Sequence, residues 1–176
     1  EQARGLPRAG IVHRLDKDTS GLMVVARSRQ AMDALVRMIA AREVSRQYLA
    51  IGQRPWVGSP VRHVNAPIGR DPRNRLRMAV VELDRNPGKT AQTDIEVLEN
   101  GADGCLVRCT LHTGRTHQIR VHMASVHHPL LGDTMYGGLP NEAISRQALH
   151  AFRLAFPHPV TGQELVFLCE PPDDMR

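Results

Sequence analysis

The sequence contains few aromatic residues and no long hydrophobic run. Phe, Trp and Tyr make up 3% of the 176 residues, which argues against an RNA-binding surface built from stacked aromatic rings. No apolar stretch approaches the ~20 residues that a membrane-spanning helix needs. Residues 1–10 also lack the pattern of a secretory signal peptide. We therefore expect a protein that does not associate with membranes.

Cysteine is also scarce. The sequence has three cysteines, Cys105, Cys109 and Cys169, with no CxxC pair, and an odd number cannot pair completely within one chain. This pattern predicts a reduced protein of the cytoplasm without a disulfide framework. Cys105 and Cys109 lie in an apolar segment, and we expect them to pack in the core.

Lysine is nearly absent from the basic residues. Only Lys17 and Lys89 are lysines among the 23 Lys and Arg residues, and the net charge is +5. The arginine guanidinium is planar and can donate two parallel hydrogen bonds to a phosphate or a base edge. The composition therefore favours a nucleic-acid partner. A genome that simply prefers arginine over lysine would produce the same bias.

The pattern of apolar residues predicts one domain of the α+β class. Met32, Leu35, Val36 and Ile39 form an apolar stripe that predicts a helix over residues 29–42. Thr116 is the expected N-cap of a second helix, at residues 117–127. Predicted strands occupy residues 22–26, 48–52, 78–81, 90–98, 105–111, 147–156 and 164–169, and those at 90–98 and 105–111 form a hairpin. Because strands follow one another without crossover helices, we expect a central, mainly antiparallel mixed sheet flanked by a few helices, not a doubly wound parallel sheet.

The densest polar segment is residues 13–21, between two apolar segments. A charged loop next to core strands is a common location for reactive groups. Asp16 and Asp18 are two residues apart and would point to opposite sides of an extended chain. We therefore expect one carboxylate to act chemically while the other caps the turn, and not a facing pair as in glycosidases. The alternative is a solvated turn in which Asp18 and Thr19 bond to their own backbone.

A second polar segment, residues 113–122, surrounds the start of the second predicted helix. Arg115 and His117 lie where a helix N-terminus favours anions and are candidates to contact phosphates. Arg120 is a candidate to hold a buried carboxylate in its ionised form. The alternative is a basic helix face that is exposed to water.

A third basic segment, residues 70–77, contains four arginines. It could follow a phosphate backbone, or it could be a solvated loop.

The sequence gives no sign of a metal or nucleotide cofactor. Of the nine histidines, His117 and His122 are five residues apart, which places them on different faces of a helix, and no HExxH motif occurs. The phosphate-binding motifs GxxxxGK[ST] and GxGxxG are also absent. We therefore expect no metal site and no nucleotide cofactor.

Five motifs occur in a characteristic order. They are GIVHRLDKDTSGL at residues 10–22, QYLA at 47–50, residues 113–122, HPLLGD…YGG at 128–138, and QALHA at 147–151 followed by His158-Pro159. Together they resemble the RNA pseudouridine synthases typified by ribosomal large-subunit synthases A and D, and most closely the D type. This resemblance implies the pseudouridine synthase fold and an isomerase that converts uridine to pseudouridine in RNA.

The resemblance also implies roles for individual residues. Asp16 corresponds to the catalytic aspartate, which acts as nucleophile or as base toward the ribose. Tyr48 corresponds to the tyrosine that stacks on the target base, and Arg120 to the arginine that pairs with the aspartate. Arg14 corresponds to the arginine that enters the RNA stack as the base leaves, and Leu149 to an apolar residue of the pocket.

For the protein as a whole, the resemblance implies an enzyme that acts on RNA, with large-subunit ribosomal RNA as the expected substrate, and we expect a monomer. Transfer RNA is an alternative substrate, and a catalytically idle RNA-binding module is an alternative function. The combination of Asp16, Tyr48 and Arg120 argues against the idle module. We expect residues 1–176 to be a catalytic-domain fragment, with the first strand region, an N-terminal RNA-binding module and a last helix outside it.

Overall fold

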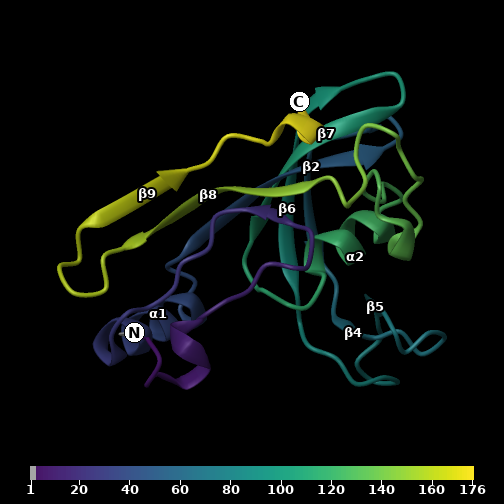
Figure 1. Cartoon of the computed structure of the whole chain (residues 1–176). Coiled ribbons are helices and arrows are strands. Elements are labelled where there is room, and N and C mark those ends of the chain that lie inside the picture. Colours follow the sequence, from purple (N-terminus) through teal and green to yellow (C-terminus); the bar gives the residue numbers. More distant parts are fainter. Residues whose placement is uncertain (1–2) are drawn as a thin grey trace.

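A seven-stranded mixed β-sheet forms the centre of the computed structural model, which describes residues 3–176 (Figure 1). Its strand order is β1-β8-β2-β7-β6-β3, with β9 paired to β8. The strands are β1 (Ser20–Gly21), β2 (Ser45–Gln53), β3 (Val61–Asn65), β6 (Gln92–Asn100), β7 (Gly104–Leu111), β8 (Leu149–Pro157) and β9 (Glu164–Leu168). Only β1 joins this sheet in parallel, along β8. The predicted α+β class with a mainly antiparallel sheet is confirmed.

Strand β2 lies between β7 and β8 at the middle of the sheet. Its residues alternate strictly between half-buried and buried, from Ser45 to Gln53, as expected for a strand whose successive side chains point to opposite faces. The pairing with β8 shifts register between Gln47 and Tyr48. Such bulges commonly occur beside active sites because they redirect a side chain. The predicted hairpin is confirmed as the antiparallel pair β6–β7.

Helix α1 (Arg29–Ala40) begins at Ser28, whose side chain accepts a hydrogen bond from the Ala31 amide. Met32 and Leu35 are buried as predicted, but Val36 is 49% exposed. The buried face is therefore rotated away from Val36, and the predicted stripe was wrong at that position.

Helix α2 (Gln118–Ser125) is shorter than predicted, and Thr116 is not its N-cap. That position belongs to His117, whose backbone is left-handed with φ of 57°. The Gln118 side chain does not cap the helix but orders the loop before it: its Oε1 accepts hydrogen bonds from the Arg115 amide and the Thr113 hydroxyl. The predicted apolar face of Ile119, Met123 and Val126 is buried, as expected.

Residues 22–26 do not form the predicted strand. Their one β-bridge joins Val25 to Ile11, while the Leu22 amide donates to the Ala151 carbonyl oxygen and the Ala26 amide to that of Gly10. The Val24 amide donates to the His13 ring at 2.9 Å and not to a neighbouring strand. Gly10 permits this crossing, because a Cβ there would lie 2.1 Å from the Ala26 carbonyl oxygen.

A two-stranded hairpin, β4 (Ile68–Arg70) with β5 (Met78–Val80), stands beside the main sheet. Asp71 organises its loop, accepting from the Arg73 amide and from the Arg77 side chain. The arginines of this loop other than Arg77 are exposed. Short 3-10 turns complete the fold at Pro7–Gly10, Thr134–Tyr136 and Asp173–Met175.

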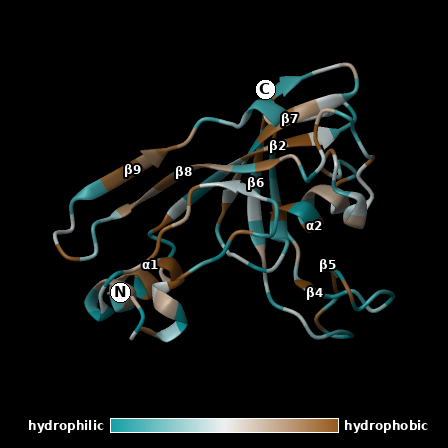
Figure 2. Cartoon of the chain, in the orientation of Figure 1, coloured by the Kyte–Doolittle hydropathy of each residue, from teal (hydrophilic) through white to brown (hydrophobic). Residues whose placement is uncertain are grey.

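The core has two main parts, one under each helix. The first lies between α2 and strands β2 and β7 and contains Cys105 and Cys109, which are buried as predicted. The second lies between α1 and the far part of β8. Figure 2 shows hydrophobic residues in the middle of β2 and along parts of β7, β8 and β9. Within residues 3–176, neither α-helix has the length and hydrophobicity to span a bilayer.

Candidate active site

A cavity of about 320 Å³ opens between the face of β2, the loop at residues 12–19 and the loop that leads into α2. Its walls contain residues from all of the motifs at 10–22, 47–50 and 113–122. The polar and apolar residues that matter most for its chemistry are Arg14, Asp16, Arg46, Tyr48, Arg115 and Leu149.

The loop that carries Asp16 is held in place from two sides. The Thr19 amide donates to the Asp16 carbonyl oxygen, closing a tight turn. Arg146 donates to the Asp18 carbonyl oxygen and Gln147 to that of Lys17. Asp16 itself is 16% exposed at its side chain, so the carboxylate is mostly enclosed yet reachable from the cavity.

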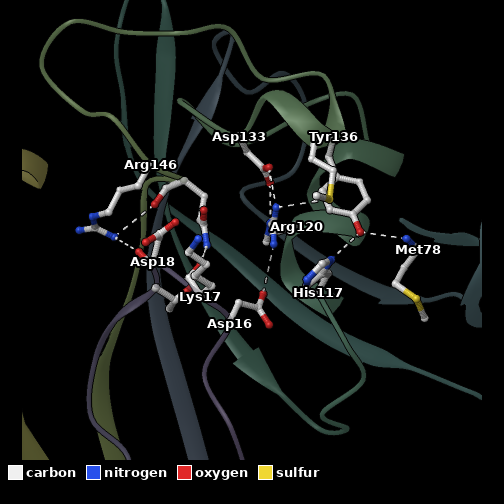
Figure 3. Close-up of polar contacts among 12 residues, drawn as sticks. Asp16, Lys17, Asp18, Met78, His117, Arg120, Asp133, Tyr136 and Arg146 are labelled. Carbon is white, nitrogen blue, oxygen red and sulfur yellow. Dashed lines mark hydrogen bonds and ion pairs between the residues drawn. The ribbon is translucent and has the colours of Figure 1, made fainter. Parts of the chain in front are cut away.

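Arg120 lies directly behind Asp16 (Figure 3). Its Nε and Nη2 donate to the two carboxylate oxygens of Asp133 at 2.8 and 2.9 Å. The remaining nitrogen, Nη1, lies 3.7 Å from Asp16 Oδ2. The guanidinium also sits over the Tyr136 ring, 5.0 Å from its centroid. Arg120 is therefore fixed by Asp133 and Tyr136 and presents one nitrogen to Asp16.

The charges around Arg120 keep it a cation in this buried place. Burial alone lowers the pKa of Arg120, but the hydrogen bonds that it donates to Asp133 and the negative charges of Asp133 and Asp16 outweigh burial, so the pKa stands above its usual value. Arg120 is 7% exposed, and the alternative of a water-exposed basic helix face is therefore wrong for this residue.

Tyr48 lies on β2 and is 6% exposed. Burial raises the pKa of its hydroxyl to about 12; the Arg46 charge opposes this shift and the Asp16 charge adds to it. The hydroxyl therefore stays protonated at neutral pH. Within residues 3–176 it makes no hydrogen bond, which leaves it free toward the cavity that Tyr48 lines.

The other predicted residues divide between the cavity and its surroundings. Arg14 is exposed and Arg115 half-buried at the cavity wall, while Leu149 is buried there. Arg115 is oriented by a hydrogen bond from its Nε to the Thr90 carbonyl oxygen. His117 is outside the lining of the cavity.

The His117 ring turns toward Tyr136 and forms a hydrogen bond of 2.7 Å with its hydroxyl. Burial and the Arg120 charge lower the pKa of His117. The Tyr136 hydroxyl also accepts a hydrogen bond from the Met78 amide. His117 thus belongs to the support behind Arg120.

Three residues important to this geometry were not singled out from the sequence: Asp133, Tyr136 and Arg46. Asp133 and Tyr136 were part of the fourth recognised motif, but nothing in the spacing indicated that they would meet Arg120. Arg46 stands two residues before Tyr48, and on a strand that spacing places both side chains on one face. That spacing was the available signal for Arg46.

No set of three or more His, Cys, Asp or Glu side chains in residues 3–176 lies close enough together to hold a metal ion. The expectation of no metal site stays a prediction.

The chain is similar to known proteins in sequence and in fold. The family model described as RNA pseudouridylate synthase matches residues 1–125. The chain is 48% identical to the ribosomal large subunit pseudouridine synthase D of Neisseria meningitidis serogroup A, over 97% of this chain and 47% of that protein. It is 49% identical to the protein of that name from Vibrio parahaemolyticus, over 97% of this chain and 54% of the relative.

Among solved structures, human RNA pseudouridylate synthase domain containing 1 superposes with a TM-score of 0.78 at 30% identity. The match covers 92% of this chain and 68% of the human one. The chain belongs to the RNA pseudouridylate synthase family. It spans about half the length of the curated relatives it matches.

Proposed function

We propose that the protein converts uridine to pseudouridine in RNA, and that its substrate is large-subunit ribosomal RNA. One observation carries the proposal: a cavity contains the Asp16 carboxylate beside a protonated Tyr48, and a buried arginine backs that carboxylate at 3.7 Å. The names of the relatives that match at 47–49% identity support the ribosomal substrate. An RNA-binding module would need the arginines but would have no use for Asp16.

The reaction begins with extrusion of the target uridine from the RNA. A stacked base cannot reach an enclosed carboxylate, and unstacking it costs a few kcal/mol. The exposed Arg14 stands two residues from Asp16 at the cavity wall. Its guanidinium fills the space that the base leaves in the stack. Arg115 contacts the backbone phosphates, and the Leu149 side chain packs on the base.

The bond from uracil N1 to ribose C1′ then breaks, and its electron pair stays with the uracil. The cleavage leaves C1′ short of an electron pair, and two routes supply one. Asp16 forms a bond to C1′ as a nucleophile, or Asp16 removes the C2′ proton and a C1′–C2′ double bond forms. In both routes the uracil carries a negative charge while Tyr48 holds it by stacking.

The uracil turns in place, and its C5 attacks C1′. Asp16 leaves C1′, or returns its proton to C2′. The C5 proton is then lost and N1 gains a proton, so that substrate and product contain the same atoms. The sequence of steps consumes no oxidant, reductant or second substrate, and we propose that it needs no metal or other cofactor.

We further propose that residues 1–176 act as a catalytic domain, that the protein is monomeric, and that it works in the cytoplasm. The three cysteines are unpaired, as is usual in reducing compartments.

The test uses unmodified large-subunit ribosomal RNA labelled with tritium at uracil C5, together with the natural protein that carries this sequence and a chelator. We expect tritium release, followed by detection of pseudouridine at mapped positions. Tritium release from transfer RNA alone would identify transfer RNA, and not ribosomal RNA, as the substrate. Binding without release from either RNA would support the idle module and overturn the proposed activity.

A further inference from the structure

Arg46 is a buried cation without a partner. It lies on β2, is 8% exposed, and lines the same cavity as Asp16. Its Nε is fully enclosed and has no hydrogen-bond partner. No side-chain nitrogen of Arg46 forms an ion pair or a hydrogen bond within residues 3–176. By contrast, the similarly buried Arg120 has both Asp133 and Asp16.

An unpaired buried charge is costly for the folded protein. Taking a guanidinium out of water is repaid only by opposite charges or by several hydrogen bonds. Burial accordingly lowers the pKa of Arg46. Replacing such a group by an apolar side chain usually leaves stability unchanged or raises it. A residue that lowers the stability of the free protein in this way is expected at a position where a bound ligand supplies the missing interactions.

The surroundings of Arg46 locate its guanidinium within the cavity. A Cβ on Gly114 would lie 2.6 Å from Arg46 Nη1, so the guanidinium packs against the loop that leads into α2 and occupies space that a larger residue would fill. Arg46 and Tyr48 share one face of β2, two residues apart. The pKa of Tyr48 responds to both Arg46 and Asp16, so the tyrosine stands within electrostatic reach of both charges.

We propose that Arg46 donates hydrogen bonds to the carbonyl oxygens of the extruded uracil and stabilises the negative charge that the base carries when the N1–C1′ bond breaks. The inference rests on the proposed function. Arg46 is a catalytic residue in this account, because it touches the reacting base.

The base, and not an RNA phosphate, fits this position. Phosphates stay on the strand outside the cavity, where the half-buried Arg115 at the cavity wall is available to them. The extruded base is the part of the substrate that enters the depth of the cavity, where it stacks on Tyr48 and comes beside Arg46. The uracil is neutral when it enters and anionic after bond cleavage, so a buried cation interacts more strongly with the transition state than with the substrate.

The charge balance is simple. The electron pair of the N1–C1′ bond moves onto the uracil and is shared among N1, O2 and O4. Arg46 stays protonated and transfers no proton. When C5 bonds to C1′, the charge on the base disappears, and Arg46 returns to its resting state.

The test compares Arg46→Met and Arg46→Lys with the unaltered natural protein, under single-turnover conditions with saturating RNA. Removal of one donor to a developing oxyanion typically lowers the rate by about 10²–10³-fold. We expect a loss of this size for Arg46→Met and a smaller one for Arg46→Lys. The RNA dissociation constant and its salt dependence stay unchanged, and the Tm of Arg46→Met is equal or higher. Arg29→Met, at an exposed arginine of α1, is the control and retains the full rate.

A second measurement uses a target 5-fluorouridine, whose electron-withdrawing fluorine makes the base a better leaving group. The rearranged nucleoside is quantified after digestion of the RNA. We expect the rate loss of Arg46→Met to be smaller on this substrate than on uridine. An equal loss on both substrates would overturn charge stabilisation by Arg46.

Two further outcomes would also overturn the inference. A contact to phosphate would weaken RNA binding and reduce the slope of log K against log salt by about 1, with the saturated rate unchanged. A structural role would lower the Tm and leave the rate per folded molecule unchanged. Failure of the unaltered protein to form pseudouridine would instead overturn the proposed function, and this inference with it.

Discussion

Asp133 and Asp16 share Arg120 unequally. Asp133 accepts two hydrogen bonds from it, at 2.8 and 2.9 Å, whereas Asp16 lies 3.7 Å from the one remaining terminal nitrogen. The stronger pair fixes the guanidinium, and the longer contact leaves the Asp16 carboxylate free to approach a sugar. Asp133 is thus a positioning residue that acts through Arg120.

Asp133→Asn should destabilise the fold strongly. The asparagine side chain would keep one acceptor and turn an amide group toward the guanidinium, so the buried pair is broken. Breaking a buried pair costs about 3–5 kcal/mol of unfolding free energy. Urea denaturation at pH 7 measures this loss. Asp33→Asn is the matched control, because the exposed Arg29–Asp33 pair on α1 should contribute only about 0.3–0.5 kcal/mol. Equal losses in the two variants would contradict a strong contribution of the buried Asp133–Arg120 pair to stability.

Asp16→Asn should abolish isomerisation and leave RNA binding almost unchanged. The amide is similar in shape but neither attacks C1′ nor removes a proton, and losing such a group costs about 10⁴-fold or more in rate. Tritium release and a filter-binding assay measure the two properties. Asp18→Asn is the control, because Asp18 is exposed, lies in the left-handed region with φ of 70°, and asparagine tolerates that conformation. An Asp16→Asn protein that still converts uridine would remove Asp16 from the mechanism.

The sequence predicted elements best where one physical signal was sufficient. The hydrophobic spacing in α1 is such a local signal, and the helix appears near the expected position although Val36 is exposed. The segment at 22–26 was mispredicted because its apolar, β-branched residues suit a strand, while the His13 side chain occupies the Val24 amide. A contact of that kind depends on the tertiary fold and leaves no periodic signal.

In the candidate site, too, residues in recognised motifs could be predicted, whereas contacts that depend on the tertiary fold could not. Asp16, Tyr48 and Arg14 were identified by resemblance, and the fold brings them to one cavity. The partners of Arg120 could not be predicted, because Asp133 lies 13 residues further along the chain and reaches it only through the turn after Leu130. The unpaired state of Arg46 is visible only when all neighbours are known.

Tyr48→Phe and Tyr48→Leu should separate the ring of Tyr48 from its hydroxyl. The ring stacks on the base, so Phe should retain glycosidic bond cleavage, while Leu should lose it. The hydroxyl stands free in the cavity, and its loss should slow C5 proton removal by about 10²–10³-fold, as expected for a group that assists proton transfer. Tritium release, compared with chromatographic detection of the cleaved or rejoined base, distinguishes the steps. Full tritium release by Tyr48→Phe would show that the hydroxyl has no part in proton removal.

Acidification should destabilise the protein partly through His13. Burial, followed by the Arg46 charge, lowers the pKa of His13 from 6.5 to about 4. The unfolded chain therefore binds a proton at a higher pH than the folded one, so stability falls as the pH drops from 6.5 toward 4 and levels off below that. Urea midpoints at pH 7 and at about pH 4.5 measure the change. His13→Gln should show a smaller fall between these two pH values. An identical fall in both proteins would assign the acid sensitivity to other groups.

Arg14→Ala should slow the reaction only where the target base must leave a stack. Arg14 is exposed at the cavity wall and has no hydrogen bond or ion pair within residues 3–176, so the fold should be unaffected by its removal. On a uridine in a structured stem, the variant must unstack the base without a side chain to fill the gap. Because unstacking costs a few kcal/mol, we expect a loss of about 10–100-fold in the single-turnover rate. On a short single-stranded RNA with the same target uridine, the rate at saturating RNA should equal that of the unaltered protein. Equal losses on the two RNAs would assign Arg14 to general phosphate binding and not to base extrusion.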